Sequence, residues 1–387
     1  MQPGSAILSK GHTVKVMIAA NDFHRQWLDI QEDALAAFRK TGESGWYILG
    51  EEVRGFEAAL ASYWGTSHAA GVASGLDAIE ISLRILGCQA GDSVLTTPIS
   101  AFATTLAILK IGAMPVFADT DGRGLLDLNR CRDLFWRRPD IRFFVPVHLY
   151  GHALDMTALR GMRAEFHINI VEDCAQSIGA RFRGQATGTA GQLAAVSFYP
   201  TKNLGALGDG GAILAQKPEH HAQALALRDY GQTAKYRHEV VGYNSRLDEI
   251  QAALLAGVML PRLEKWIARR REIASLYMAG IGHRDVRAPG APEGSESSWH
   301  LFPVLVPAGR KAAFLDYLKS SGITPAEHYP VIIPDQPVMA HAAFELADDC
   351  QNARRFVASE VSLPIHPYLK DEEVARVIEV VNAWKTQ

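Results

Sequence analysis

The pattern of apolar and polar positions divides the chain into short apolar runs and longer helical stretches. Seven runs of strand length occur in its first part, at residues 69–73, 93–97, 115–119, 143–148, 168–173, 193–198 and 211–215. Patterns with helical spacing separate the early runs, for example at 77–86 and 103–111. This alternation predicts an α/β fold with a mostly parallel seven-stranded sheet flanked by helices. A glycine-rich turn joins the last two runs without room for a helix, so we expect one of them to run antiparallel.

The C-terminal part has a different pattern. A long helical stretch follows Asn244, and Pro261 lies within it, where a proline should kink or break the helix. Beyond this point the pattern predicts a smaller α+β region, with a strand at 301–306 and helices at 310–320 and 371–384. We therefore expect a large α/β domain with an N-terminal arm over residues 1–260, and a small α+β domain over 261–387.

Composition excludes several classes of protein. Of the 387 residues, 48% are hydrophobic and 21% are charged, as is ordinary for a soluble globular enzyme. The net charge of -3 offers no basic surface for nucleic acid, and no apolar run approaches the ~20 residues of a membrane span. Residues 1–5 lack the features of a secretory leader, so we expect a cytoplasmic protein. The cysteines have no spacing typical of a disulfide framework or a metal site, at Cys88, Cys131, Cys174 and Cys350.

One lysine stands in an unusual position. Lys202 lies within Ser-Phe-Tyr-Pro-Thr-Lys-Asn-Leu-Gly, just after the apolar run at 193–198 and before a glycine-rich turn. A lysine there is at a sheet edge where ligands bind, on a backbone that lets a ligand approach. Taken alone, such a lysine is more often a solvated surface cation. The glycines at 205–211 do not follow the order of a dinucleotide-binding turn, so we do not expect an NAD site.

A second run ends in an acid. Asp173 closes the apolar run at 168–173, within Ile-Val-Glu-Asp-Cys-Ala-Gln. An acid at a strand end commonly does no more than cap a turn. A lysine that can form a Schiff base and an acid that can pair with a pyridinium nitrogen are, however, the two main contributions of a protein to pyridoxal phosphate (PLP) chemistry. The two segments together favour that chemistry.

The segment Ser74-Gly-Leu-Asp77 has two compatible interpretations. Ser74 can cap a helix with Asp77 at its third position, as in a capping box. The same helix N-terminus can hold a phosphate, because its free N–H groups and its dipole attract anions.

These segments resemble those of the sugar-nucleotide aminotransferase family (the DegT/StrS group), which has the aspartate-aminotransferase fold of type I PLP enzymes. The resemblance covers residues 27–367 and is closest to members that act on nucleotide-linked 3-keto-sugars. Further motifs lie in the family's order, at 45–50, 74–78, 147–151 and 242–251. A related branch with histidine in place of the lysine comprises sugar dehydratases, so Lys202 favours an aminotransferase.

The resemblance implies a role for each site residue. Lys202 would bind PLP and shuttle a proton, and Asp173 would pair with the ring nitrogen. The cofactor ring would stack on Phe102, and its phenolic oxygen would contact Gln176. The residues implied for the cofactor phosphate are Ser74, Gly75, Leu76, Ser197 and Asn244 of a neighbouring subunit. His328 and Tyr329 would face the sugar. Phe102 could instead be ordinary core, and His328 with Tyr329 a packing pair at a helix end. Cys174 is expected to be buried filler without a catalytic role, and we expect no metal.

The resemblance also implies an activity. We expect a PLP-dependent aminotransferase that moves an amino group, from glutamate, to a nucleotide-linked keto-sugar such as a dTDP-3-keto-deoxyhexose. The product would be an amino sugar for lipopolysaccharide or antibiotic biosynthesis. The enzyme would be a homodimer with shared active sites. A keto-cyclitol aminotransferase of the same family and a non-catalytic PLP-binding regulator are the alternatives, and the intact lysine and acid argue against the regulator.

Overall fold

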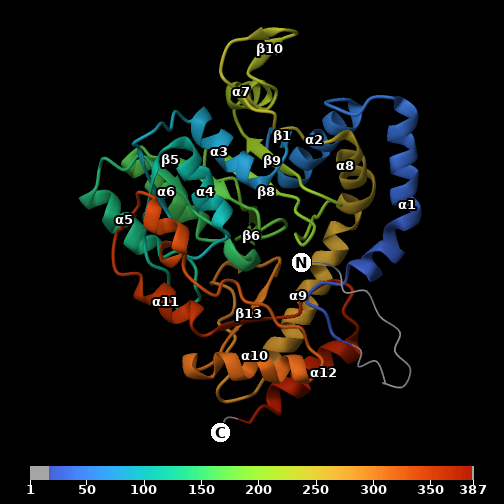
Figure 1. Cartoon of the computed structure of the whole chain (residues 1–387), viewed down its shortest axis with the longest axis vertical. Coiled ribbons are helices and arrows are strands. Elements are labelled where there is room, and N and C mark those ends of the chain that lie inside the picture. Colours follow the sequence, from blue (N-terminus) through green and yellow to red (C-terminus); the bar gives the residue numbers. More distant parts are fainter. Residues whose placement is uncertain (1–16, 386–387) are drawn as a thin grey trace.

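A twisted sheet forms the centre of the larger part of the molecule. The computed structural model describes residues 17–385, so residues 1–5, considered above for a leader, lie outside them. Eight strands are hydrogen-bonded in the order β1-β9-β8-β5-β4-β2-β3-β14. Figure 1 labels β1, β9, β8 and β5 of this sheet. Their bounds are β1 (His68–Val72), β2 (Ser93–Thr96), β3 (Met114–Phe117), β4 (Phe143–Val145), β5 (Asn169–Asp173), β8 (Leu193–Ser197), β9 (Gly211–Ala215) and β14 (Glu345–Leu346).

The sheet confirms the seven predicted strands and adds one. β9 runs antiparallel to both β1 and β8, while β2, β3, β4, β5 and β8 are joined by parallel pairs. The expectation of one antiparallel strand is therefore correct. The prediction of seven strands is short by β14, which comes from the C-terminal part and pairs in parallel with the β3 edge. A strand of two residues has no periodicity that a sequence pattern can reveal.

Helices cover both faces of the sheet. Alternate strand residues enter different hydrophobic clusters: Ala194 packs with one set of helices and Ala195 with another. This division explains why the strands read as continuous apolar runs. The helices of this part are α1 (Phe23–Ser44), α2 (Glu51–Trp64), α3 (Gly75–Ile85), α4 (Phe102–Ile111), α5 (Leu128–Arg137), α6 (Met156–Phe166) and α7 (Pro218–Arg228).

A long helical segment connects the two parts of the chain. It comprises α8 (Glu249–Leu254), a π-turn (Leu255–Met259), a 3-10 turn (Leu260–Arg262) and α9 (Leu263–Gly280). Pro261 lies in the 3-10 turn, where the chain keeps helical dihedral angles and only the hydrogen-bond spacing changes. Along α9, Ile267 packs into the large part, while Ile273 packs into the C-terminal cluster. The domain boundary at 260/261 stays a prediction.

The C-terminal part forms a smaller α+β unit. Its paired strands are β13 (Phe302–Leu305) and β15 (Glu360–Leu363), with the helices α10 (Lys311–Ser320), α11 (Gln351–Val357) and α12 (Asp371–Asn382). Asp119, just beyond β3, accepts hydrogen bonds from the backbone N–H groups of Asn352 and Ala353 and so caps α11 from the other part of the molecule. The predicted strand and both predicted helices of this region are confirmed.

Two small sheets complete the chain. One contains β6 (Arg181–Phe182), β7 (Gln185–Ala186) and β12 (Ser295–Glu296). The other is a hairpin of β10 (Gln232–Ala234) and β11 (Arg237–His238), which projects beyond α7 (Figure 1). Across residues 17–385, none of the helices combines the length and the hydropathy that a membrane crossing requires.

Candidate active site

A cavity of about 300 Å³ lies where the predicted cofactor residues meet. Its wall includes the first turn of α3, the start of α4, the end of β5 and the segment after β8. Most of the residues predicted for the cofactor line it, namely Ser74, Gly75, Leu76, Asp173, Gln176, Ser197 and Lys202. The structure therefore brings together groups that come from four separate segments of the chain.

Lys202 lies in the segment that follows β8. Its backbone N–H donates to the carbonyl of Tyr199 at 2.8 Å, which closes the turn that carries the side chain. Burial lowers the pKa of the Lys202 amine to about 8, although the charge of Asp173 opposes this shift. A larger share of the amine is then neutral near pH 7 than in an ordinary lysine. A neutral amine is the form that attacks a carbonyl carbon and accepts a proton.

Asp173 is held in place by hydrogen bonds at both of its carboxylate oxygens. The side chain is buried, Oδ2 accepts a hydrogen bond from the Thr104 hydroxyl at 2.8 Å, and Oδ1 accepts one from the Ala175 N–H at 3.0 Å. Two donors at one carboxylate fix the direction of the side chain. Thr104, whose own hydroxyl lies 2.9 Å from that of Ser100, was missed by the sequence analysis. The sequence feature that could have indicated Thr104 is its spacing from Ser100, because two hydroxyl residues lie four positions apart at a helix start.

The N-terminus of α3 opens into the cavity. The Ser74 hydroxyl accepts a hydrogen bond from the Asp77 N–H at 3.1 Å, so the predicted cap is present. The Asp77 carboxylate accepts from the Ser245 hydroxyl at 2.7 Å. A Cβ on Gly211 would come within 2.4 Å of the Ser74 carbonyl carbon, and one on Gly75 within 2.7 Å of the Ser197 Cβ. Glycine at these positions lets the start of α3 approach β8 at Ser197 and β9 at Gly211, which shapes an anion pocket.

Gln176 connects the cavity with the C-terminal part. Its Oε1 accepts from the Tyr150 N–H at 2.9 Å, and its Nε2 donates to the Tyr329 hydroxyl at 3.0 Å. The Tyr150 hydroxyl in turn donates to the His328 carbonyl oxygen. Tyr329 therefore lies against the cavity wall, and His328 precedes it in the chain. Their contact with a sugar, and that of Gln176 with a cofactor, stay predictions.

Two predicted cofactor residues do not line this cavity. Phe102 is the first residue of α4 and packs, partly buried, against the hydrophobic cluster on one face of the sheet. Asn244 is exposed and forms an isolated backbone bridge with Asp229. The position of Asn244 is compatible with a contact to a second subunit. The ring-stacking role of Phe102 and the phosphate contact of Asn244 stay predictions.

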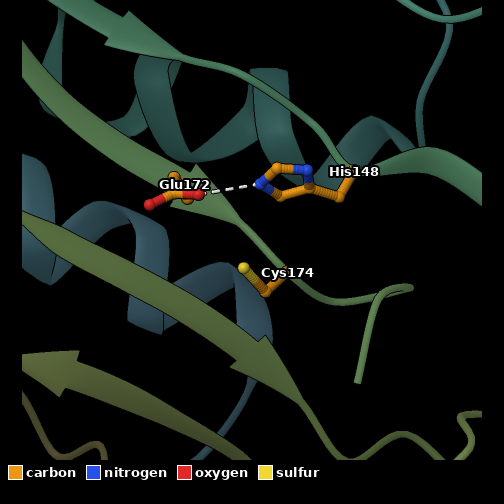
Figure 2. Close-up of side chains that lie close together, drawn as sticks. All are labelled: His148, Glu172 and Cys174. Carbon is orange, nitrogen blue, oxygen red and sulfur yellow. Dashed lines mark hydrogen bonds and ion pairs between the residues drawn. The ribbon is translucent and has the colours of Figure 1, made fainter. Parts of the chain in front are cut away.

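A second polar cluster lies behind the cofactor residues. His148, Glu172 and Cys174 have their ligand atoms close enough for a metal ion, and Figure 2 shows the His148 ring pointing at the Glu172 carboxylate. All four polar atoms of His148 and Glu172 already have partners, however: Glu172 accepts from His148 Nε2, Gly188, Ala190 and Gly191, and His148 Nδ1 accepts from Leu154. Burial raises the pKa of the Cys174 thiol, which keeps it protonated. Cys174 is fully buried, as expected.

The sequence as a whole matches a described family. Residues 28–382 match the profile of the DegT/DnrJ/EryC1/StrS aminotransferase family. The chain belongs to this family. The structure has its fold and is that of an aminotransferase whose cofactor is PLP. The residues around the cavity fit the cofactor, because they supply a buried amine, a held carboxylate and a helix N-terminus closed by glycines.

Curated relatives match over nearly their whole length. The chain is 39% identical to the dTDP-3-amino-3,4,6-trideoxy-alpha-D-glucose transaminase of Streptomyces venezuelae, with 94% of this chain and 95% of the relative covered. It is 34% identical to the UDP-N-acetyl-3-dehydro-alpha-D-glucosamine 3-aminotransferase of Acidithiobacillus ferrooxidans, with 95% and 98% covered. Both names describe transaminases of nucleotide-linked sugars.

Solved structures of related aminotransferases have the same fold as this chain. The chain superposes on S. venezuelae DesV in complex with a ketimine intermediate with a TM-score of 0.91, at 38% identity, covering 95% of this chain and 98% of that chain. It also superposes on NtdA from Bacillus subtilis with bound cofactor PMP with a TM-score of 0.83, at 26% identity, covering 91% and 81%.

Proposed function

We propose that this aminotransferase transfers an amino group from glutamate to the keto group of a nucleotide-linked sugar, with a dTDP-linked 3-keto-deoxyhexose as the favoured acceptor. The observation that carries the proposal is the meeting of Lys202, Asp173 and the α3 N-terminus in one cavity. The 3-amino sugars in the names of the relatives from S. venezuelae and Aneurinibacillus thermoaerophilus support the acceptor. A keto-cyclitol acceptor is the alternative within the family.

Each cavity residue has a task that follows from its chemistry. The first turn of α3, with Ser74, Gly75 and Leu76, would hold the PLP phosphate through N–H groups and the helix dipole. Asp173 would keep the pyridine nitrogen protonated, because a fixed carboxylate beside it stabilises the added positive charge. When bound, PLP supplies an electron sink for the bonds at the reacting carbon.

Lys202 would move the proton. Its amine would hold the cofactor in the resting enzyme, and once freed by an amino donor, Nζ would take the proton from the donor's α carbon. The pKa of about 8 suits this task, since the amine can both accept and return a proton near neutral pH. The reverse transfer in the second half-reaction would deliver the amino group to the keto-sugar.

The activity is tested by turnover and by labelling. We expect the purified protein, reduced with borohydride, to carry the cofactor on the peptide that contains Lys202, and Lys202→Ala to lose transamination. Lys217→Ala is the matched control, because Lys217 is exposed and pairs with the exposed Glu219. Glutamate with 3-keto and 4-keto nucleotide sugars, compared side by side, then tests the acceptor. Labelling of another lysine would refute the site, and preference for a 4-keto sugar or a keto-cyclitol would refute the acceptor.

We also propose a homodimer that shares its active sites. The exposed position of Asn244 supports this, as do the exposed aromatic rings of Trp46 and Tyr47. Asn244→Asp places a carboxylate where a partner's phosphate would bind, so this variant and Lys202→Ala should both be inactive. Mixed under subunit exchange, the two variants should regain activity, because one site of each mixed dimer is intact. Mixed dimers without activity would show that Asn244 does not serve its partner.

A further inference from the structure

A buried carboxyl group lies behind the histidine predicted to face the sugar. Glu360, the first residue of β15, is fully buried. Its Oε2 accepts a hydrogen bond from the His328 backbone N–H at 2.7 Å, and its Oε1 accepts one from the Ser362 hydroxyl at 2.6 Å. Residues two apart on a strand point to the same side, which explains why Glu360 and Ser362 both reach His328. The two carboxylate oxygens therefore hold both the backbone of His328 and the residue that contacts its ring.

The hydroxyl of Ser362 determines which ring nitrogen of His328 carries the proton. Ser362 Oγ lies 2.9 Å from His328 Nδ1. A hydroxyl has a single proton, and that of Ser362 is donated to Glu360, so the contact with the ring requires Nδ1–H to donate to Oγ. Burial, together with the charge of Lys202, lowers the pKa of His328 to about 4, so the ring is neutral and has one proton only. That proton is on Nδ1.

The other ring nitrogen is available to a ligand. His328 Nε2 makes no hydrogen bond to any residue between 17 and 385. The next residue, Tyr329, is hydrogen-bonded to Gln176 of the cavity wall, and the charge of Lys202 acts on the pKa of the His328 ring, so the ring lies near the cavity that contains Lys202. A neutral nitrogen with a lone pair accepts a hydrogen bond from a hydroxyl group, and sugars present hydroxyl groups.

We propose that Glu360, acting through Ser362, is a positioning residue that keeps His328 in the Nδ1–H tautomer and thereby presents Nε2 as a hydrogen-bond acceptor to a hydroxyl of the sugar. This inference rests on the proposed function, because it deepens the account of the acceptor site. It assigns a specificity: an acceptor that covers Nε2 without placing a hydroxyl there takes this nitrogen away from water, leaves it unpaired and is disfavoured.

The relay depends on the charge of Glu360. Burial raises the pKa of Glu360 to about 7, against the hydrogen bonds of Ser362 and His328 and the charge of Lys311, while the charge of Glu327 raises it further. Lys311 and Glu327 pair with each other at 2.6 Å, and Tyr150 and Tyr329 also face the carboxyl group. When Glu360 is protonated, it donates to Ser362, Ser362 donates to Nδ1, and the ring proton moves to Nε2. The acceptor then becomes a donor, so the relay acts above about pH 7.

The tautomer can be observed without any substrate. In protein labelled with ¹⁵N-histidine, the nitrogen chemical shifts distinguish protonated from unprotonated ring nitrogens, and His328→Asn identifies the signals. At pH 8 we expect Nδ1–H in the wild type and in Ser362→Thr, which keeps the hydroxyl. Glu360→Gln should give Nε2–H, because the amide donates to Ser362 and reverses the relay, and Ser362→Ala should lose the preference for Nδ1–H. Nε2–H in the wild type, or Nδ1–H retained in Glu360→Gln, would overturn the proposal.

The two half-reactions separate positioning from a general structural effect. In single-turnover experiments at pH 8, Glu360→Gln should slow the keto-sugar half-reaction about tenfold or more, and leave the glutamate half-reaction within about twofold. Ser362→Ala should behave in the same way, and Ser362→Thr should restore the rate. Glu327→Gln is the matched control, because it removes a nearby carboxylate outside the relay. Equal slowing of both half-reactions would mean a structural role and overturn the proposal. A wild type that reacts with neither substrate would refute the proposed function instead, and the tautomer measurement would still decide the relay.

Discussion

Two buried glutamates, each beside a histidine, have pKa values that are shifted in opposite directions. Glu172 accepts four hydrogen bonds, from His148 and from the backbone N–H groups of Gly188, Ala190 and Gly191. Burial alone would raise its pKa, but the hydrogen bonds from His148 and from the backbone donors hold the pKa below its usual value. From residues 17–385, Glu360 accepts two hydrogen bonds, and burial raises its pKa to about 7.

The difference shows that donors, rather than burial, decide the state of a buried acid. Both carboxylate oxygens of Glu172 accept hydrogen bonds, and both ring nitrogens of His148 have partners. This cluster therefore has no free nitrogen or oxygen atom for a ligand and stabilises the fold. At Glu360 fewer donors leave the carboxyl group able to change its charge, and one nitrogen of His328 remains open. We therefore assign the saturated cluster to structure and the unsaturated one to substrate recognition.

The largest effect should follow from breaking the saturated cluster. Glu172→Gln replaces one oxygen with an NH₂ group, which faces donors instead of accepting from them and leaves buried N–H groups unpaired. We expect a loss of about 3–5 kcal/mol in the free energy of unfolding, measured by urea denaturation. Glu219→Gln is the control, since that carboxylate is exposed. A loss below about 1 kcal/mol would contradict the assignment of this cluster to structure.

A smaller effect should distinguish the two acids by the sign of their pH dependence. The stability that Glu172 contributes is present above the pKa of an unfolded glutamate and is lost as the pH falls through its lowered folded pKa. For Glu360 the folded protein binds the proton more tightly, so stability decreases as the pH rises from about 4.5 to about 7.

Urea denaturation of the wild type and of each glutamine variant at pH 5 and pH 8 measures these slopes. Relative to Glu360→Gln, the wild type should lose up to about 3 kcal/mol over this interval. Relative to Glu172→Gln, the wild type should lose no stability as the pH rises from 5 to 8. It should lose stability only when the pH falls below this interval. Parallel curves for the two comparisons would remove the basis for treating the acids differently.

The sequence predicted much of the site because each motif is local. Neighbouring residues are enough to predict Ser74 at a helix start, Asp173 at a strand end and Lys202 before a turn. The seven strands follow from apolar runs. The Glu360–Ser362–His328 relay and the Thr104–Asp173 hydrogen bond join segments that are far apart in the chain, and no pattern along it indicates them. The resemblance supplied the roles of Phe102 and Asn244, which a single chain does not display.

The smallest effect concerns the third member of the saturated cluster. Cys174→Ala removes a buried sulfur atom but no donor or acceptor of the His148–Glu172 pair, so we expect a loss of about 1 kcal/mol in stability and unchanged turnover. Added zinc should change neither protein, because the nitrogen and oxygen atoms already have partners. Loss of activity in Cys174→Ala, or zinc bound by the wild type and not by the variant, would give this thiol a function.

The pairing of β14 with β3 has a consequence for how the polypeptide is made. On the ribosome, β3 emerges long before residues 345–346, so this side of the nascent sheet has unsatisfied backbone groups throughout most of synthesis. The Asp119 carboxylate likewise lacks its donors until the backbone of residues 352 and 353 has been synthesised. A truncated product that ends before β14 would therefore have an open strand edge, and such edges promote aggregation and recruit chaperones.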